Sequence, residues 1–297
     1  MSGASRPERH LIIGAGQVGT ALSKSLSALL NPVRLLVHSE YDLREPAKLE
    51  SILDSEDFDR VWLTAAITNV DWCEEHPDEA FAVNAVAPGE IARICSDRGL
   101  SLVHFSTDYV FDGLSNGKTR NKPYIESDAT NPLNEYGRAK LQGEKLVAAG
   151  HPSASIVRTS AVYAPAGTNF FKAILGKFHE MGSVEVVSEQ FVSLTYAPHL
   201  ADWLAAFHKQ LPQGIFHVAG SGAASWFEIA RAAFGLLGLP ESGVLPTGAG
   251  IPDRPARRPA YSVLGSEVLP AFSFPFLPSW LEGLSSWAAE SKLMGNS

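Results

Sequence analysis

The sequence predicts an α/β protein with a Rossmann-type, doubly wound parallel sheet and a smaller carboxyl-terminal lobe. Two observations carry this prediction. Short apolar runs alternate with longer helical patterns up to about residue 160. The first apolar run leads directly into a glycine-rich turn that opens a helix. Apolar strands separated by helices are typical of a parallel sheet that is covered on both faces.

The first half of the chain accounts for the sheet. The expected strands span residues 11–13, 33–37, 60–65, 101–106 and 155–158. The expected helices lie near residues 17–30, 46–54, 78–98 and 136–149. Strands joined in this way through helices are expected to pair in parallel through right-handed crossovers.

After residue 163 the pattern loosens. It predicts helices near residues 169–181, 198–209, 226–238 and 278–292, with strands at 184–187 and 215–218. We therefore expect a Rossmann domain over residues 1–160 and a smaller lobe over residues 161–297. The boundary is soft, because a late strand can return to the first sheet. Such folds bind ligands at the carboxyl edge of the sheet, so we expect this lobe to bind the substrate.

Composition excludes several classes of function. The net charge is −8 and no long basic run occurs, which argues against a nucleic-acid partner. Cys73 and Cys95 give no disulfide framework and indicate a reducing compartment. No H-x-x-x-H or C-x-x-C spacing indicates a metal site. The first apolar run, Leu11–Ile13, is too short for a signal peptide or a membrane span. A soluble, cytoplasmic protein without a membrane partner is expected.

A dinucleotide site is predicted at the first strand–helix turn. Gly14, Gly16 and Gly19 form G-x-G-x-x-G, which lets the backbone approach a pyrophosphate at a helix amino end. The motif alone is weak, because glycine-rich turns also occur for packing reasons. Its place in the first βαβ unit favours a dinucleotide, so residues 1–160 are expected to bind NAD(P).

The end of the second strand bears on the choice of cofactor. His38 and Ser39 could accept a 2′-phosphate, whereas Glu40 could bind a free 2′-hydroxyl. All three could equally be solvated turn residues. This pattern favours NADP(H), with NAD(H) as the alternative.

Candidate catalytic residues lie near residues 107 and 136–140. Tyr136 and Lys140 are four residues apart, so a helix places them on one face. A nearby cation lowers the pKa of a tyrosine, which is ordinarily about 10. With the Thr107 hydroxyl aimed at the same place, the three groups suit protonation of a carbonyl oxygen while hydride reaches its carbon. The alternative is an ordinary amphipathic helix with an exposed lysine and a strand-end hydroxyl that satisfies the backbone.

At these positions the sequence resembles a known family. The stretches that carry the resemblance include S-T-D-Y-V-F-D-G at 106–113, K-P-Y-I-E-S-D-A-T-N-P-L-N-E-Y-G-R-A-K-L-Q-G-E at 122–144 and A-R-R-P-A-Y-S-V-L at 256–264. They resemble the extended short-chain dehydrogenase/reductase superfamily and, more narrowly, the dTDP-4-dehydrorhamnose reductase family. The resemblance runs nearly from end to end.

This resemblance implies NAD(P)H-dependent reduction of the 4-keto group of a nucleotide-linked 6-deoxysugar. Tyr136 would be the proton donor, Lys140 would hold the nicotinamide ribose and lower the tyrosine pKa, and Thr107 would bond the keto oxygen. The expected cofactor contacts are Gly14, Gly16, Gln17, Val18, Gly19, His38, Ser39, Asp42, Leu43, Ala66, Ile67, Thr68, Asn84, Phe105, Tyr136 and Lys140. The expected substrate contacts are Thr107, Asp108, Ala161, Asn169, Gln190 and Arg258.

The sequence departs from the family pattern near the ligand pockets. Ile13 replaces the first glycine of the opening motif, and His38 stands where a basic residue is common. Ala161 replaces a tryptophan that lies against the sugar, and residues 189–195 lack the usual glycine and proline. The last two changes suggest a reductase with altered substrate scope. Tyr109 replaces the glutamate of related dehydratases, which favours simple reduction over elimination.

Several alternatives stay open. A related sugar-nucleotide reductase or epimerase could act on a different substrate. The chain also resembles the regulatory β subunit of methionine adenosyltransferase, a non-catalytic NADP-binding protein. Arg158 could meet a diphosphate or serve as a structural ion-pair partner. A homodimer is suggested by the family alone.

Overall fold

The computed structural model describes residues 6–167, 169–248 and 254–295, and its centre is a parallel sheet. The strands are β1 (His10–Ile13), β2 (Val33–Leu36), β3 (Arg60–Leu63), β4 (Ser101–Thr107), β7 (Ser155–Thr159) and β12 (Gly214–His217). Their order is β12-β7-β4-β3-β1-β2. The order reverses beside β1, where connections leave in opposite directions and open a crevice at the carboxyl ends of β1 and β3.

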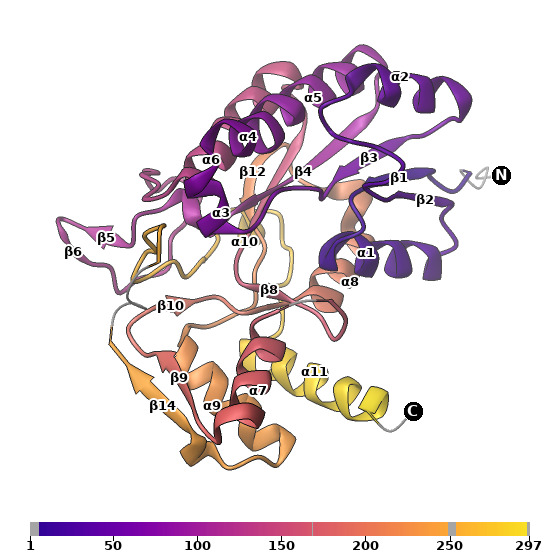
Figure 1. The fold of residues 1–297 in the computed structure, drawn as a ribbon. Coiled ribbons are helices and arrows are strands. Elements are labelled where there is room, and N and C mark those ends of the chain that lie inside the picture. The colour runs from indigo at the N-terminus through magenta and orange to yellow at the C-terminus, as the bar shows by residue number, and fades with distance from the viewer. Residues whose placement is uncertain (1–5, 168, 249–253, 296–297) are drawn as a thin grey trace.

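Helices cover both faces of this sheet (Figure 1). One face packs against α2 (Pro46–Ser55), α5 (Ala87–Asp97) and α6 (Glu135–Gly150), and the other against α1 (Gln17–Ala28) and α8 (Ala197–Phe207). Ile91 is buried in the core under α2, α5 and α6, and Trp62 in the core under α1 and α8. Covering on both faces explains why the strands read as continuous apolar runs.

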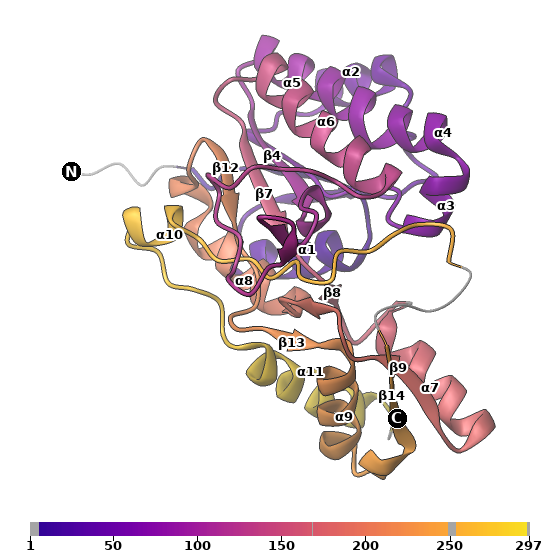
Figure 2. The ribbon, with the colours of Figure 1, turned by 90° about the vertical axis from the view of Figure 1, so that its left-hand side faces the viewer.

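A second group of elements packs around its own core, below the sheet in Figures 1 and 2. Its helices are α7 (Phe170–Met181), α9 (Trp226–Leu237) and α11 (Trp280–Gly295). Its short strands are β8 (Val162–Tyr163), β9 (Val184–Val187), β10 (Phe191–Val192), β11 (Thr195–Tyr196), β13 (Ala224–Ser225) and β14 (Val244–Thr247). Between these elements the chain returns to add α8 and β12 to the sheet. The division at residue 160 itself stays a prediction.

The Rossmann-type fold class expected from the sequence is confirmed. The elements with clear periodicity all form, within a few residues of the expected ranges. The long helix expected at 78–98 is divided into α4 (Pro77–Phe81), a π turn at Ala82–Val86, and α5. Pieces too short for a periodic signal were not expected. They include α3 (Val70–Glu75), the hairpin of β5 (Leu114–Ser115) and β6 (Lys118–Thr119), α10 (Val268–Ala271), and the short strands β8, β10, β11, β13 and β14 of the second core. No helix in the described ranges combines the length and apolarity that a membrane span requires.

Candidate active site

A cavity of about 1510 Å³ lies at the carboxyl edge of the sheet. This volume exceeds the roughly 300–1,000 Å³ of a site for one small ligand, so a dinucleotide and a second molecule could share it. Most of the predicted residues line it: Gly14, Gly16, Gln17, Val18, Gly19, His38, Asp42, Leu43, Ala66, Ile67, Thr68, Phe105, Thr107, Asp108, Tyr136, Lys140 and Ala161. The structure therefore brings the candidate cofactor residues and the candidate catalytic residues to one space.

The glycine-rich turn is shaped for a close approach by a ligand. Gly14 has a φ of 111°, and a Cβ there would lie 2.6 Å from the backbone nitrogen of Ala65. A Cβ on Gly19 would lie 1.9 Å from the carbonyl oxygen of Gly14. α1 begins directly after Gly16. Among the described residues, no side chain caps this end of the helix. The N–H groups and the positive dipole end of this helix suit a pyrophosphate.

Asn84 supports the cavity from behind. Its side-chain nitrogen donates to the carbonyl oxygen of Ile67 at 2.8 Å, and its side-chain oxygen accepts from the Ile67 N–H at 2.9 Å. Asn84 is buried in the π turn and does not itself line the cavity. Its two hydrogen bonds hold the loop of residues 66–68, and this loop lines the cavity.

The turn after β2 pairs the predicted residue Asp42 with Arg44, which the sequence did not single out. Arg44 binds Asp42 through two nitrogens, with Nη2–Oδ2 at 2.6 Å and Nε–Oδ1 at 2.9 Å. Hydrogen bonds from Arg44 hold the pKa of Asp42 well below its usual range. Both side chains line the cavity. Glu40 turns back and accepts the backbone N–H of Val37 at 3.1 Å.

Tyr136 and Thr107 meet where α6 begins beside the end of β4. Asn134 caps α6 by accepting the N–H of Gly137 at 2.8 Å, which places Tyr136 in the first turn. Burial raises the pKa of Tyr136, a hydrogen bond with Thr107 lowers it, and the charge of Asp108 raises it further. The phenol is protonated at neutral pH with or without this shift, but a raised pKa makes it a weaker proton donor.

Lys140 lies one turn further along α6 and is 2% exposed. Its Nζ is 3.5 Å from Nε2 of His104, a residue of β4 that the sequence did not single out. Burial lowers the pKa of Lys140 to about 8, although the charge of Glu144 acts in the opposite direction. Burial and the Lys140 charge keep the pKa of His104 well below its usual value, so its ring is a neutral acceptor. The expected lowering of the Tyr136 pKa by Lys140 stays a prediction.

A buried ion pair lies directly behind Lys140. Arg158 of β7 binds Glu144 of α6, with Nη2–Oε2 at 2.7 Å and Nε–Oε1 at 2.8 Å. Ser106 also donates to Glu144, and Arg158 donates to Nε2 of His217 at 3.4 Å. Of the two roles considered for Arg158, the structure shows the structural ion pair.

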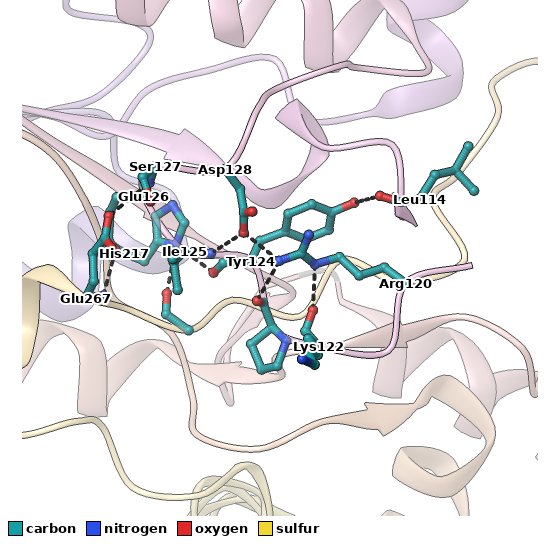
Figure 3. Close-up of polar contacts among 12 residues, drawn as sticks. Leu114, Arg120, Lys122, Tyr124, Ile125, Glu126, Ser127, Asp128, His217 and Glu267 are labelled. Carbon is teal, nitrogen blue, oxygen red and sulfur yellow. Dashed lines mark hydrogen bonds and ion pairs between the residues drawn. The ribbon is translucent and has the colours of Figure 1, made fainter. Parts of the chain in front are cut away.

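The segment that contains Tyr124 joins this network (Figure 3). Nδ1 of His217 lies 2.8 Å from the carbonyl oxygen of Gly265 and 3.2 Å from that of Tyr124. Glu126 accepts the backbone N–H groups of His217 and Glu267, both at 2.8 Å. These contacts tie the stretch before α6 to β12.

Five predicted residues, all within the described ranges, do not line the cavity: Ser39, Asn84, Asn169, Gln190 and Arg258. Ser39 lies in an exposed turn, and Gln190 is buried. Asn169 caps α7 by accepting the Lys172 N–H at 3.2 Å. Its side-chain nitrogen donates to the carbonyl oxygen of Ala164, a cavity residue, at 2.7 Å.

Arg258 joins the carboxyl-terminal half of the chain to α3. Its Nη2 lies 2.7 Å from Oδ2 of Asp71 in an ion pair, and it also donates to the carbonyl oxygen of Ala256. A substrate contact was expected at this position. In this structure the guanidinium is already paired.

Glu8, His10 and His208 form a separate cluster whose possible ligand atoms lie within 4.8 Å of one another. The Trp62 indole N–H donates to Nδ1 of His10 at 3.2 Å. Burial, with the nearby His208, lowers the pKa of His10 to about 3, so its ring is neutral and its proton is on Nε2. Neither ring nitrogen then offers a free lone pair, so the cluster fits a metal ion poorly.

The sheet order, the glycine-rich turn and the residues Thr107, Tyr136 and Lys140 on one cavity define a class, the extended short-chain dehydrogenases/reductases. Within that class the chain belongs to the family described as the RmlD substrate binding domain, whose model matches residues 9–293. The family resemblance inferred from the sequence is confirmed.

Named relatives agree with this assignment. The chain is 36% identical to a dTDP-4-dehydrorhamnose reductase of Mycolicibacterium smegmatis, covering 95% of this chain and 85% of the relative. It is 37% identical to the reductase of that name from Mycobacterium tuberculosis strain H37Rv, covering 95% and 93%. The crystal structure of a Bacillus anthracis dTDP-4-dehydrorhamnose reductase in complex with NADP superposes with a TM-score of 0.90 at 31% identity, covering 96% of this chain and 100% of that one.

Proposed function

We propose that the chain is an NADPH-dependent oxidoreductase that reduces the 4-keto group of a nucleotide-linked 6-deoxysugar, of the dTDP-4-dehydrorhamnose reductase type. One observation carries this proposal. Thr107, Tyr136 and Lys140 line the same cavity as the glycine-rich turn. A regulatory protein that only binds a dinucleotide would not need a hydroxyl, a phenol and an amine together on that wall.

The residues present fit a nicotinamide dinucleotide. Gly14 and Gly19 leave no room for a Cβ, and the amino end of α1 offers its N–H groups to a pyrophosphate. Arg44, which is paired with Asp42, and His38 line the end of the cavity after β2, where a 2′-phosphate would lie. The relative from Bacillus anthracis was crystallised with NADP. We therefore propose NADP(H), with NAD(H) as the alternative.

The proposed mechanism assigns one role to each residue. NADPH, when bound, supplies the hydride. The phenol of Tyr136 donates its proton to the keto oxygen, a step that typically contributes about 10²–10⁴-fold. The Thr107 hydroxyl donates a hydrogen bond to the same oxygen. Lys140 has N–H donors beyond the one that faces His104, and these can hold the ribose hydroxyls.

Ala161 motivates a narrower proposal about substrate scope. This alanine lines the cavity, and its φ is 43°. The methyl group gives a sugar ring no apolar platform of the kind that a tryptophan would provide. Together with the changed residues 189–195, this motivates the proposal that the chain is a reductase with altered substrate scope. Reduction of dTDP-4-dehydrorhamnose with ordinary efficiency would refute this narrower proposal alone.

A cytoplasmic location and a homodimer remain part of the proposal. The location rests on the two free, buried cysteines, which suit a reducing compartment. The homodimer rests on the family resemblance alone, and sedimentation of the purified protein would test it.

An absorbance assay tests the proposed function. The purified protein is incubated with NADPH or NADH and a panel of 4-keto sugar nucleotides that includes dTDP-4-dehydrorhamnose. We expect oxidation of NADPH with at least one member and slower oxidation of NADH. If no member is reduced while NADPH still binds, the enzymatic proposal fails and the regulatory binding role is favoured.

A further inference from the structure

Asp108 is a buried carboxyl group on the wall of the cavity, 3% exposed. Its Oδ1 lies 3.2 Å from Oγ1 of Thr107, and its Oδ2 lies 2.9 Å from Oγ of Ser160. Oγ1 of Thr107 also accepts the backbone N–H of Tyr109 at 3.2 Å. The Thr107 hydroxyl thus lies between a carboxyl group and the phenol of Tyr136.

A count of donors and acceptors restricts this hydroxyl. A threonine hydroxyl has one proton and two lone pairs. An ionised Asp108 can only accept, so it takes the single proton of Thr107. That proton is then unavailable to a keto oxygen in the cavity.

A protonated Asp108 reverses this arrangement. Its O–H can donate to one lone pair of Thr107, while the N–H of Tyr109 occupies the other. The proton of Thr107 then turns away from Asp108 toward the cavity, where it faces the oxygen of the Tyr136 phenol or a keto oxygen that takes its place.

We infer that the protonation state of Asp108 sets the direction of the Thr107 hydroxyl, and that Thr107 donates to the substrate keto oxygen only while Asp108 carries a proton. This inference rests on the proposed reduction of a keto sugar. Asp108 acts here as a positioning residue, because its effect passes through Thr107.

The surroundings of Asp108 make both protonation states accessible near neutral pH. Hydroxyl groups surround it, namely those of Thr107, Ser160 and Ser262. The titratable groups that face it are the phenols of Tyr109 and Tyr136, which stay neutral in this range. Burial raises the pKa of Asp108 to about 6, although the hydrogen bonds from those hydroxyls act in the opposite direction.

The nearest cations are engaged elsewhere. Arg258 reaches Tyr109 but is paired with Asp71. Lys140 faces His104. Because the active form is the protonated one, kcat/KM should fall as the pH rises through the pKa of Asp108.

The pH dependence of kcat/KM tests this inference, with wild type compared with Asp108→Asn. Ser160 should bond the amide oxygen, which turns the amide N–H groups toward Thr107 and imitates the protonated acid. One fixed donor to a developing oxyanion is worth about 10²–10³-fold. We expect wild-type kcat/KM to fall by about tenfold or more between about pH 5.5 and about pH 8. The Asp108→Asn profile should vary by less than about threefold over that range. A flat wild-type profile, or a variant that keeps the decline, would overturn the inference.

Variants of Thr107 provide a matched control. Thr107→Ser keeps a hydroxyl and should keep the decline with pH. Thr107→Val has no hydroxyl to orient, so its lower activity should no longer depend on pH in this range. A decline that persists in Thr107→Val would show that Asp108 acts by another route.

A second measurement needs no catalytic activity. The carboxyl groups of ¹³C-labelled protein are titrated by NMR, and the resonance lost in Asp108→Asn is assigned to Asp108. We expect it to titrate near pH 6, against about 4 for an ordinary aspartate. Titration at or below 4 overturns the inference. If the labelled protein titrates as expected but reduces no sugar nucleotide, it is the proposed function that fails.

Discussion

Two successive turns of α6 face the same strand, and they hold their charged side chains in opposite ways. Lys140, on the cavity, has a neutral ring nitrogen of His104 at 3.5 Å, and burial lowers its pKa to about 8. Glu144, one turn further, accepts two hydrogen bonds from Arg158 and one from Ser106. The Lys140 ammonium keeps N–H donors that a ligand can use, whereas protein groups satisfy the Glu144 carboxylate.

The geometry of the two elements produces this contrast. Alternate residues of β4 point the same way, which aims His104 and Ser106 at α6. Residues four apart on α6 share a face, which aims Lys140 and Glu144 at β4. His104 therefore meets Lys140, and Ser106 meets Glu144. Only Glu144 also binds Arg158 of β7. We propose that the turn with Lys140 serves ligand binding, whereas the turn with Glu144 serves the fold.

Glu144→Gln should have the largest effect on stability. It leaves the guanidinium of Arg158, 3% exposed, without a counter-charge. Loss of one partner of a buried pair costs about 3–5 kcal/mol in the free energy of unfolding, measured by urea denaturation. Asp97→Asn, which breaks the exposed pair with Arg93, is the control and should cost at most about 0.5 kcal/mol. Similar losses in both variants would remove the distinction between the two turns.

Lys140→Met should change stability with the opposite sign. The buried ammonium has a pKa lowered from 10.5 to about 8, so its charge destabilises the folded state at and below neutral pH, on the order of 3 kcal/mol. That penalty recedes as the pH rises from about 8 toward 10.5, where the lysine loses its proton. In urea denaturation at pH 7 the variant should be more stable than wild type, with a smaller difference at alkaline pH. Destabilisation like that of Glu144→Gln would show that Lys140 serves the fold as well.

Ala161→Gly should have the smallest effect. Ala161 adopts a φ of 43° on the cavity wall, a region that glycine occupies without strain. Glycine should therefore raise the free energy of unfolding by about 0.5–1 kcal/mol. Ala148→Gly, on the exposed face of α6, is the control and should lower it by about 1 kcal/mol. A loss in both variants would mean that the backbone at Ala161 is not strained.

The sequence predicted what local patterns encode. Periodicity predicted the strands and long helices, and spacing predicted that Tyr136 and Lys140 share a face. It could not choose a partner for Arg158, because Glu144 becomes its neighbour only when β7 and α6 pack together. The Arg258–Asp71 pair joins residues 187 positions apart and has no local signal.

The position of His104 near Lys140 could have been anticipated in part from the sequence. It precedes Thr107 by three residues on a strand expected from the sequence, and the alternation of side chains along that strand sets it apart from Phe105. A neutral acceptor aimed at α6 could have been proposed from that pattern. Its distance to Lys140 still required the fold.

Turnover by Tyr136→Phe tests the central claim most directly, measured beside wild type with NADPH and the best sugar nucleotide of the panel. If Tyr136 donates the proton, kcat should fall by about 10²–10⁴-fold. The dissociation constant for NADPH, followed by fluorescence, should stay within about twofold of wild type, because the phenol adds little to dinucleotide binding. A variant that keeps wild-type turnover would contradict the proposed role of this site.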